Sequence, residues 1–344
     1  MSKVAVIIPN YNGKKYLTEC LKSLQKQTFK DFCVIIVDNA STDGSIEQVE
    51  KEFCRRNALQ ETELNLSIIR LSENTGFANA VNVGIRAAAG DCADYSSDVH
   101  SEYVFLLNND TRCDKEAIGA LVKVLDHDNS IFSIQAKMLQ FKDTDLVDDA
   151  GDYYCALGWA YSPGKDKPSS DYRRRTFVTS ACAGAAMYRT ETFDQIGYFD
   201  EVHFCYLEDV DVGYRARLFG YKNAMEPSAI VFHAGSGSSG SRHNAFKVEL
   251  TASNNLYLIY KNMPFLQLLI NMPLIIIGIL IKHIFYTKKG LGRAHIKGLK
   301  LGFSKIIDNS DKKVRVKGRQ ILCCIRMQLE LWINCLVIVA TKGR

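Results

Sequence analysis

The sequence lacks the cysteine and apolar patterns that define several protein classes. Its 11 cysteines include no C-x-x-C pair, and only Cys323 and Cys324 are adjacent. Neither a zinc ribbon nor a disulfide framework is indicated, and the irregular set predicts free thiols in a reducing compartment. The first apolar run, residues 4–8, ends before Pro9 and is too short for the core of a signal peptide. We therefore expect a cytoplasmic protein.

Acidic and basic residues are unevenly divided along the 344-residue chain. Residues 251–344 contain 16 Lys and Arg against 3 Asp and Glu, a net +13, whereas residues 1–250 contain 27 against 35, a net −8. The composition, 47% hydrophobic and 24% charged, is that of a globular chain long enough for two domains. An acidic body and a basic tail predict a cationic or metal-assisted ligand for the body and an anionic surface for the tail.

Apolar β-branched runs alternate with helix-like stretches in the first third of the chain. The predicted order is strand 4–8, helix 16–27, strand 32–38, helix 45–56, strand 66–71, helix 77–89 and strand 103–107. Strands without polar alternation are buried on both faces, and the intervening helices then predict a parallel α/β sheet. A mixed region follows, with predicted strands at 131–139, 177–188 and 229–233 and a helix near 210–219.

Polar residues collect where the four predicted strands end, which is the edge where such sheets bind ligands. Each group alone also fits ordinary turn and helix-cap chemistry. Asp110 follows the fourth strand and is a candidate ligand for Mg²⁺ or Mn²⁺, which take oxygen ligands and neutralise a diphosphate leaving group. A helix cap is the alternative role for Asp110.

Seven motifs follow one another in unbroken order over about residues 3–260. They are VAVIIPNYNG (4–13), VIIVDNASTDGS (34–45), ENTGFANAVNVGI (73–85), FLLNNDT (105–111), SACAGAAMYRTETFDQIGYFDE (180–201), YLEDVDVGYRARLFGY (206–221) and VFHAGSGSSG (231–240). Together they resemble the inverting family 2 glycosyltransferases of GT-A fold, especially the rhamnosyltransferase-like branch that builds bacterial surface polysaccharides. The resemblance implies a Rossmann-like mixed sheet in a catalytic domain at 1–262, followed by a basic, amphipathic helical tail at 263–344.

The resemblance also implies an activity and a donor site. A sugar would pass from a nucleotide diphosphate, with dTDP-rhamnose or a UDP-sugar favoured, to a lipid-linked or growing saccharide. The matching nucleotide-contact positions are Pro9, Asn10, Asn12, Asp38, Asn74, Gly76, Asn82 and Asn109. Physically, the Asp38 carboxylate can accept the imide N–H of uracil or thymine, although it can equally cap the following helix.

The metal motif departs from the commonest form in the resembling family. Asn108-Asn109-Asp110 stands where many members have Asp-x-Asp, so only Asp110 brings a formal charge. We expect weakened rather than abolished binding of Mg²⁺ or Mn²⁺. His233 matches a late histidine near the diphosphate and is the second predicted metal ligand, although a lone histidine is usually structural.

The predicted catalytic and acceptor residues also come from this resemblance. Asp209 matches the base that takes a proton from the acceptor hydroxyl, and Glu208 would orient Asp209 or raise its pKa. A role in complementing a helix dipole is the alternative for the pair, and it is the expected one for Asp211. The predicted acceptor-side residues are Asp200, Glu201 and Trp159.

The tail has two apolar runs, and both are interrupted. Residues 264–281 contain Gln267, Asn271 and Pro273, and residues 321–340 contain Arg326 and Glu330. Neither pattern is that of a simple bilayer span.

Between the two apolar runs, an apolar stripe is flanked by basic residues. The stripe is Ile296, Leu299, Phe303 and Ile306, and its basic neighbours are Arg293, Lys297 and Lys300. We expect peripheral attachment to an anionic membrane surface at its cytoplasmic face. A helical subdomain or a homodimer interface is the alternative, and no nucleic-acid recognition motif accompanies the charge.

Two rival functions stay open on the sequence alone. A nucleotidyltransferase would need a Gly-rich phosphate loop with a basic residue near the N-terminus, and YNGKKY (11–16) matches that poorly. A nucleotide-sugar-binding assembly protein with a degenerate metal site is suggested by the Asn-Asn-Asp triplet.

Overall fold

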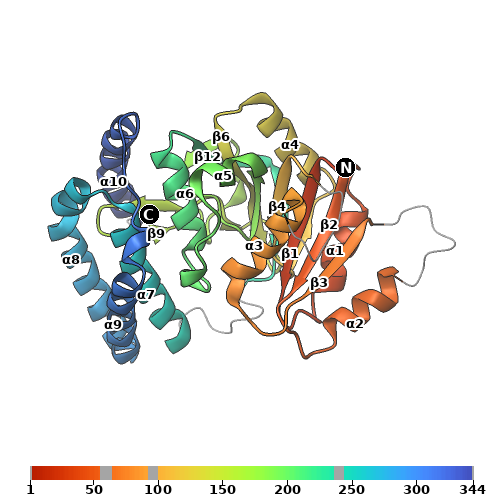
Figure 1. The fold of residues 1–344 in the computed structure, drawn as a ribbon, viewed down its shortest axis with the longest axis horizontal. Helices are drawn as coiled ribbons and strands as arrows, with labels where there is room; N and C mark the ends of the chain where they lie inside the picture. The colour runs from red at the N-terminus through yellow and green to blue at the C-terminus, as the bar shows by residue number, and fades with distance from the viewer. Residues whose placement is uncertain (1, 55–63, 92–99, 236–243, 343–344) are drawn as a thin grey trace.

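The computed structural model describes residues 2–54, 64–91, 100–235 and 244–342, so most of the GSGSSG segment lies outside it. Within these residues a ten-stranded sheet has the order β10-β12-β6-β11-β4-β1-β2-β3, with β5 on β12 and β7 on β6 (Figure 1). The strands of the first half are β1 (Val4–Asn10), β2 (Phe32–Asp38), β3 (Leu66–Arg70), β4 (Tyr103–Leu107) and β5 (Thr111–Cys113). The later ones are β6 (Ile131–Gln140), β7 (Val147–Asp149), β10 (Thr176–Val178), β11 (Ala185–Arg189) and β12 (Lys222–His233).

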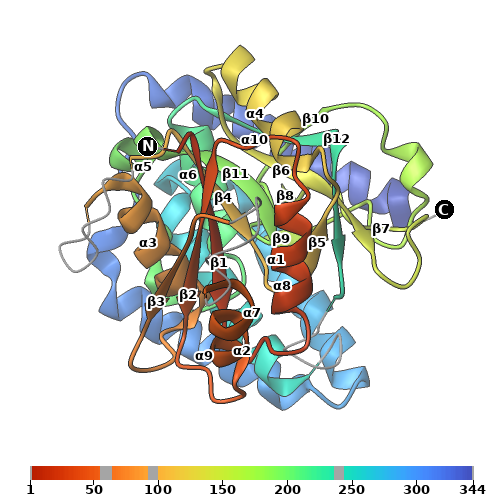
Figure 2. The same cartoon turned by 90° about the vertical axis from the view of Figure 1, so that its right-hand side faces the viewer.

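The predicted parallel sheet of the first half is confirmed. β1 pairs in parallel with β2 and β4, and β2 pairs in parallel with β3. Apolar side chains bury both faces, because one helical layer packs on each side (Figure 2). One layer consists of α1 (Leu17–Gln25), α2 (Ser45–Val49) and α4 (Ala117–His127). The other consists of α3 (Gly76–Ala89), α5 (Phe193–Ile196) and α6 (Glu208–Leu218).

The expected single strand over 177–188 is wrong, because the chain forms two strands there. β10 pairs with β12 at one edge, whereas β11 lies antiparallel between β4 and β6. Between them, Ser180 forms an isolated bridge to Asp152, and Gly184 O accepts from Asn108 N at 2.9 Å. This break lets residues 179–184 cross the sheet edge beside the Asn108-Asn109-Asp110 segment.

Four C-terminal helices form a layer on the side of the molecule remote from β2 and β3 (Figure 1). They are α7 (Ala245–Asn262), α8 (Phe265–Lys288), α9 (Gly292–Asp308) and α10 (Gln320–Lys342). α9 packs closely on α7 at Gly298, where an added Cβ would lie 2.4 Å from the Glu249 carbonyl oxygen. α8 continues through Pro273. By length and composition, α8 and Gln320–Ile338 can each cross a membrane, although their interrupted sequence predicts no simple span.

Candidate functional site

The ends of β1, β2 and β4 are joined by a chain of side-chain hydrogen bonds. Asn10 follows Pro9 in β1 and stands opposite Asp38, the last residue of β2. Asn10 Nδ2 donates to Asp38 Oδ1 at 2.9 Å and to Ser45 Oγ at 3.0 Å, and Asn109 Nδ2 donates to Asn10 Oδ1 at 2.8 Å. The structure therefore brings these predicted nucleotide-contact residues to one edge of the sheet.

The loop after β1 is held against the loop after β2. Asn12 has a positive φ of 52°, and its Oδ1 accepts from the backbone N–H of Thr42 at 2.9 Å. Gly13 approaches the two linked amides so closely that a Cβ would lie 2.2 Å from Asn10 Oδ1 and Asn109 Nδ2. A side chain at this position would therefore displace the amides that organise the edge.

The loop after β3 joins the same edge through Asn39. Asn39 Nδ2 donates to Asn74 Oδ1 at 3.0 Å and to the Gly76 carbonyl oxygen at 3.1 Å. Gly76 has φ 88°, and a Cβ there would lie 2.5 Å from the ring of Phe204. Asn74 and Gly76 thus lie between the β2 end and the segment that leads into α6.

Asn82 is placed differently from the other predicted donor residues. Its Nδ2 donates to the Phe199 carbonyl oxygen at 2.8 Å and to Glu201 Oε1 at 2.9 Å, and its Oδ1 accepts from Phe199 N at 3.1 Å. These bonds occupy both of its donor positions, and the residue is buried. Asn82 and Glu201 therefore fasten α3 to the turn before α6 rather than extending from the strand edge.

Asp200, predicted on the acceptor side, is enclosed by residues of the C-terminal region. Its carboxylate accepts from the Tyr257 hydroxyl at 2.8 Å and lies 2.8 Å from Lys261 Nζ and 3.0 Å from Lys312 Nζ. Burial opposes ionisation, but the charge of Lys261 outweighs it and holds the pKa of Asp200 below its usual range. These contacts make Asp200 a link between the turn before α6 and the C-terminal region.

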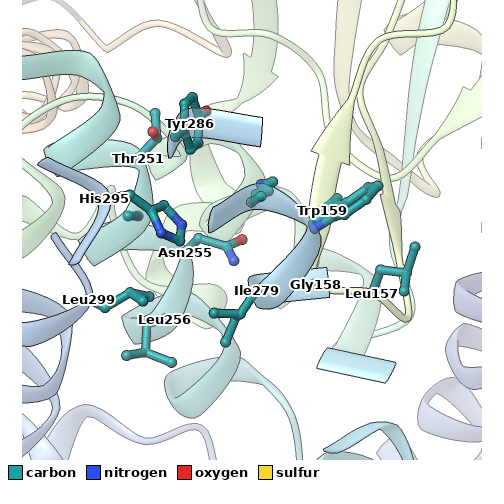
Figure 3. Close-up of a pocket in the computed structure, with 12 residues that line it drawn as sticks. Leu157, Gly158, Trp159, Thr251, Asn255, Leu256, Ile279, Tyr286, His295 and Leu299 are labelled. Atoms are coloured by element: carbon teal, nitrogen blue, oxygen red, sulfur yellow. The ribbon is translucent and has the colours of Figure 1, made fainter. Parts of the chain in front are cut away.

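Trp159, the third predicted acceptor residue, lies against α8. It belongs to the hairpin of β8 (Tyr153–Cys155) and β9 (Trp159–Tyr161). Its indole N–H donates to the Gly278 carbonyl oxygen at 3.2 Å, and Lys282 Nζ lies 5.7 Å from the centre of its ring. The ring lines a small pocket whose other walls come from α7, α8 and α9, including His295 (Figure 3). An acceptor role for Trp159 stays a prediction.

The two predicted metal ligands are adjacent. His233 ends β12, and its Nε2 lies 3.2 Å from Asp110 Oδ1, while its Nδ1 lies 2.7 Å from Asp148 Oδ2. Asp148 also forms an ion pair with Lys165. Burial opposes protonation of the imidazole, but hydrogen bonds to Asp110 and Asp148 outweigh it and raise the pKa of His233 to about 9.

This arrangement fits a divalent cation. A carboxylate that holds one imidazole nitrogen fixes the ring and leaves the other nitrogen directed at a metal, and here Asp148 holds Nδ1 while Nε2 faces Asp110. A cation between Asp110 and His233 would replace the shared proton. An imidazole ligand favours Mn²⁺ over Mg²⁺, which prefers oxygen ligands alone. Asp148 is a residue that the sequence interpretation missed.

The acidic pair at the start of α6 combines one buried and one half-buried carboxyl group. Asp209 Oδ2 accepts from Ala183 N at 3.2 Å and its Oδ1 accepts from Val210 N at 2.8 Å. Burial raises the pKa of Asp209 to about 6, with Asp149 as the like charge that adds to it. Glu208 is buried, and its Oε2 has no hydrogen-bond partner. Burial, followed by repulsion from Asp209, raises the pKa of Glu208 well above its ordinary value.

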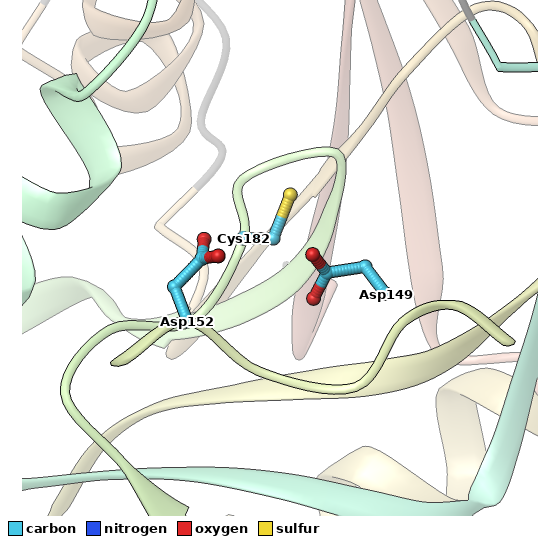
Figure 4. Close-up of side chains that lie close together, drawn as sticks. All are labelled: Asp149, Asp152 and Cys182. Atoms are coloured by element: carbon cyan, nitrogen blue, oxygen red, sulfur yellow. The ribbon is translucent and has the colours of Figure 1, made fainter. Parts of the chain in front are cut away.

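Three further residues, Asp149, Asp152 and Cys182, lie beside Asp209. One ligand atom from each lies within 4.8 Å of the other two, and the two carboxylates flank the cysteine (Figure 4). Burial raises the pKa of all three groups, and of Asp152 and Cys182 well above the ordinary value. A protonated thiol is a poor ligand, so this trio is a weaker metal candidate than Asp110 with His233. Its signal in the sequence was the acid-rich run VDDAGD at 147–152.

A cavity of about 390 Å³ opens beside Asp149, Cys182 and His233. It is lined by Asn108, Met138, Asp148, Asp149, Tyr161, Ser162, Lys165, Cys182 and His233. The volume falls within the range of small-molecule sites, and four of the lining residues are acidic or basic. Within the described residues, the cavity therefore connects His233, the partner of Asp110, with Asp149, the acid next to Asp209.

Comparison with known proteins identifies the family. Residues 5–197 match the model of glycosyl transferase family 2, which is more than half of the chain. The chain belongs to glycosyl transferase family 2. This family 2 glycosyltransferase is 24% identical over 249 residues to an N-acetylglucosaminyl-diphospho-decaprenol L-rhamnosyltransferase of Mycobacterium tuberculosis, covering 68% of this chain and 77% of the relative. The predicted family, with its likeness to rhamnosyltransferases, is confirmed.

Two solved structures share the fold of this family 2 glycosyltransferase. The S. aureus TarS 1-349 complex with UDP-GlcNAc has a TM-score of 0.51 at 19% identity, covering 94% of this chain and 79% of TarS 1-349. The mannosyltransferase PcManGT of Pyrobaculum calidifontis, in complex with GDP-Man and Mn²⁺, has a TM-score of 0.52 at 17% identity, covering 96% and 84%. The GT-A fold is thereby confirmed. As a family 2 enzyme the chain is a glycosyltransferase, so the nucleotidyltransferase and non-enzymatic hypotheses are not retained.

Proposed function

We propose that the chain is a metal-dependent, inverting glycosyltransferase that moves a sugar from a pyrimidine nucleotide diphosphate to a lipid-linked or growing saccharide. The observation that carries this proposal is the cavity lined by His233, which faces Asp110, and by Asp149 and Cys182, which lie beside the half-buried Asp209. dTDP-rhamnose or a UDP-sugar is the proposed donor, and surface polysaccharide synthesis is the proposed context. The Mycobacterium tuberculosis relative, whose name describes a diphospho-decaprenol acceptor, supports the lipid-linked acceptor.

The proposed reaction is a single displacement with Asp209 as base. The acceptor hydroxyl oxygen forms a bond to the anomeric carbon while the bond to the diphosphate breaks on the opposite face, and the hydroxyl proton passes to the Asp209 carboxylate. A pKa near 6 makes Asp209 a stronger base than an exposed aspartate while leaving it ionised at neutral pH. A cation held by Asp110 and His233 would supply charge neutralisation for the departing diphosphate.

Asp38 supports the choice of a pyrimidine. Its Oδ1 accepts from Asn10 and its Oδ2 accepts from Ser41 N at 3.1 Å, so each oxygen has a lone pair left for a ligand donor. A carboxylate at this strand end accepts the imide N–H of uracil or thymine. The UDP-GlcNAc complex of TarS, which shares the fold, is compatible with this donor class.

The donor and the metal are tested together. We expect UDP- or dTDP-sugars to raise the thermal unfolding temperature more than GDP-mannose does, because ligand binding stabilises the folded chain. Transfer should be lost with EDTA and restored by Mn²⁺. A chain that binds the donor equally with and without EDTA, and transfers in both, would contradict the metal assignment. Stronger stabilisation by GDP-mannose would contradict the pyrimidine assignment.

The pH dependence of transfer tests the base. Asp209 must be ionised to accept a proton, and its pKa is raised to about 6. We therefore expect kcat/KM to be constant above pH 7 and to fall about tenfold per unit well below pH 6, since kcat/KM reports ionisations of the free enzyme. The measurement is kcat/KM between pH 4.5 and 8.5 at saturating Mn²⁺. A profile with its midpoint near pH 4 would mean that the base is an exposed carboxylate.

A further inference from the structure

α8 has its polar and apolar faces reversed relative to an ordinary surface helix. Gln267 and Asn271 are buried against the protein, where Gln267 accepts from the Tyr214 hydroxyl at 2.6 Å and Asn271 exchanges hydrogen bonds with Gln328 of α10. The outward positions are apolar instead, for example Leu266 (65% exposed) and Leu280 (55% exposed). Water disfavours such a face, and a lipid phase favours it.

α10 repeats this reversal and adjoins α8. Asn334 is buried and its Nδ2 donates to the Tyr154 carbonyl oxygen at 2.8 Å, while Glu330 pairs with Arg217 of α6. Leu322 and Leu336 face outward, each more than 70% exposed. Because Asn271 and Gln328 join the two helices, the outward faces of α8 and α10 lie along the same end of the molecule (Figure 1).

Positive charge lies beside this apolar surface, where α8 meets α9. Residues 264–307 contain seven Lys and Arg and no Asp or Glu. Arg293, Lys297 and Lys300 line an open groove of about 480 Å³ where the end of α8 meets α9, with Lys297 also paired to Glu249 at 2.9 Å. Basic side chains beside an exposed apolar face match the two layers of an anionic bilayer, its headgroups and its acyl chains.

The contacts of α8 also fix how a bilayer would meet it. The helix touches α6 near its start through Gln267, and near its middle Gly278 packs so closely on the β8–β9 hairpin that a Cβ would lie 2.1 Å from the Leu157 carbonyl oxygen. The folded domain therefore lies along one side of α8. A bilayer would have access only to the opposite side, which is the geometry of a helix lying in the membrane interface rather than across it.

We propose that the outward faces of α8 and α10, with the basic groove at Arg293 and Lys300, dock this enzyme in the plane of an anionic membrane. Apolar side chains would enter the acyl boundary, and the groove would hold phosphate headgroups. Such docking would hold the cavity beside the bilayer in which a lipid-linked acceptor lies. The docking itself does not depend on the proposed donor or base.

The apolar face is tested by vesicle co-sedimentation of the full chain. Ile276, Leu280 and Ile284 are each more than half exposed and lie four residues apart on one side of α8. We expect I276E/L280E/I284E to lower partitioning onto phosphatidylcholine vesicles containing phosphatidylglycerol by at least about tenfold. The matched control I276L/L280I/I284L should partition like the wild type. Equal partitioning of the glutamate variant and the wild type would overturn the proposal.

The basic groove is tested by lipid charge and salt. R293Q/K300Q should weaken binding to phosphatidylglycerol vesicles by about tenfold at low salt. The binding that remains at high salt should be unchanged, since salt screens the charge. The control K30Q/K123Q removes two exposed lysines of the catalytic region and should bind like the wild type. The proposal would be overturned if the wild type did not bind the phosphatidylglycerol vesicles and formed dimers in ultracentrifugation that I276E/L280E/I284E dissociates. The surface would then belong to an interface with a second copy of the chain.

Discussion

Asp209→Asn is expected to lower the rate of sugar transfer by roughly a hundred- to ten-thousandfold, the range that a general base contributes. The amide has the same shape but a single acceptor oxygen, so it keeps one of the two bonds that Ala183 N and Val210 N donate to the carboxylate in the native protein. It cannot accept the hydroxyl proton. Donor affinity should stay within a fewfold of the native value, because the proposed nucleotide-contact residues lie at the ends of β1 and β2. Single-turnover transfer measures the loss of rate, and donor titration measures the affinity that should be kept.

Glu208→Gln is the matched control for Asp209→Asn. Burial raises the pKa of Glu208 well above its ordinary value, which favours the neutral carboxyl form that glutamine resembles. We expect activity within a fewfold of the native value. Native turnover in Asp209→Asn, or an equal loss in Glu208→Gln, would contradict the assignment of the base.

The edge of the sheet was predictable because local sequence determines it. Each of the first strands is a short apolar run followed by polar residues, and the carboxyl ends of parallel strands must meet. Asn10 and Asp38 therefore came together as expected, and Asn109 joined them. The same rule does not apply to Asn82, because this residue lies in the second turn of α3 and bonds to Phe199.

The features that the sequence did not predict depend on contacts between distant segments. The pattern over 177–188 does not reveal that its two halves pair with different strands, β12 and β4. Asp148 and Asp149 belong to a three-residue strand at the sheet margin, and only the pairing of β7 with β6 brings them to the cavity. Burial, which raises the pKa of Asp209, is likewise a property of the assembled protein and not of the motif.

Asp211 is the clearest case in which the structure changes an expectation. The sequence predicts a helix-dipole role, yet its carboxylate is fully buried and accepts from Arg215, Lys261 and Asn262. Burial opposes its ionisation, but Arg215 and Lys261 outweigh burial and hold the pKa of Asp211 well below its ordinary value. The resulting stabilisation is present above the unfolded pKa of about 4 and is lost only in strong acid.

Asp211→Ala is therefore expected to lower the free energy of unfolding by about 3–5 kcal/mol at pH 7, because it removes the carboxylate paired with the buried Arg215 and one of the two paired with the buried Lys261. Lys261 belongs to α7, so the same change loosens the join between α6, which carries Asp209, and the C-terminal helices. Urea unfolding followed by circular dichroism measures the effect. Glu50→Ala is the control, since Glu50 lies 2.7 Å from Arg70 just as Asp211 lies 2.7 Å from Arg215, but the Glu50–Arg70 pair is exposed. Its loss should cost at most about 1 kcal/mol. Equal costs for the two variants would show that burial does not set the strength of the Asp211 network.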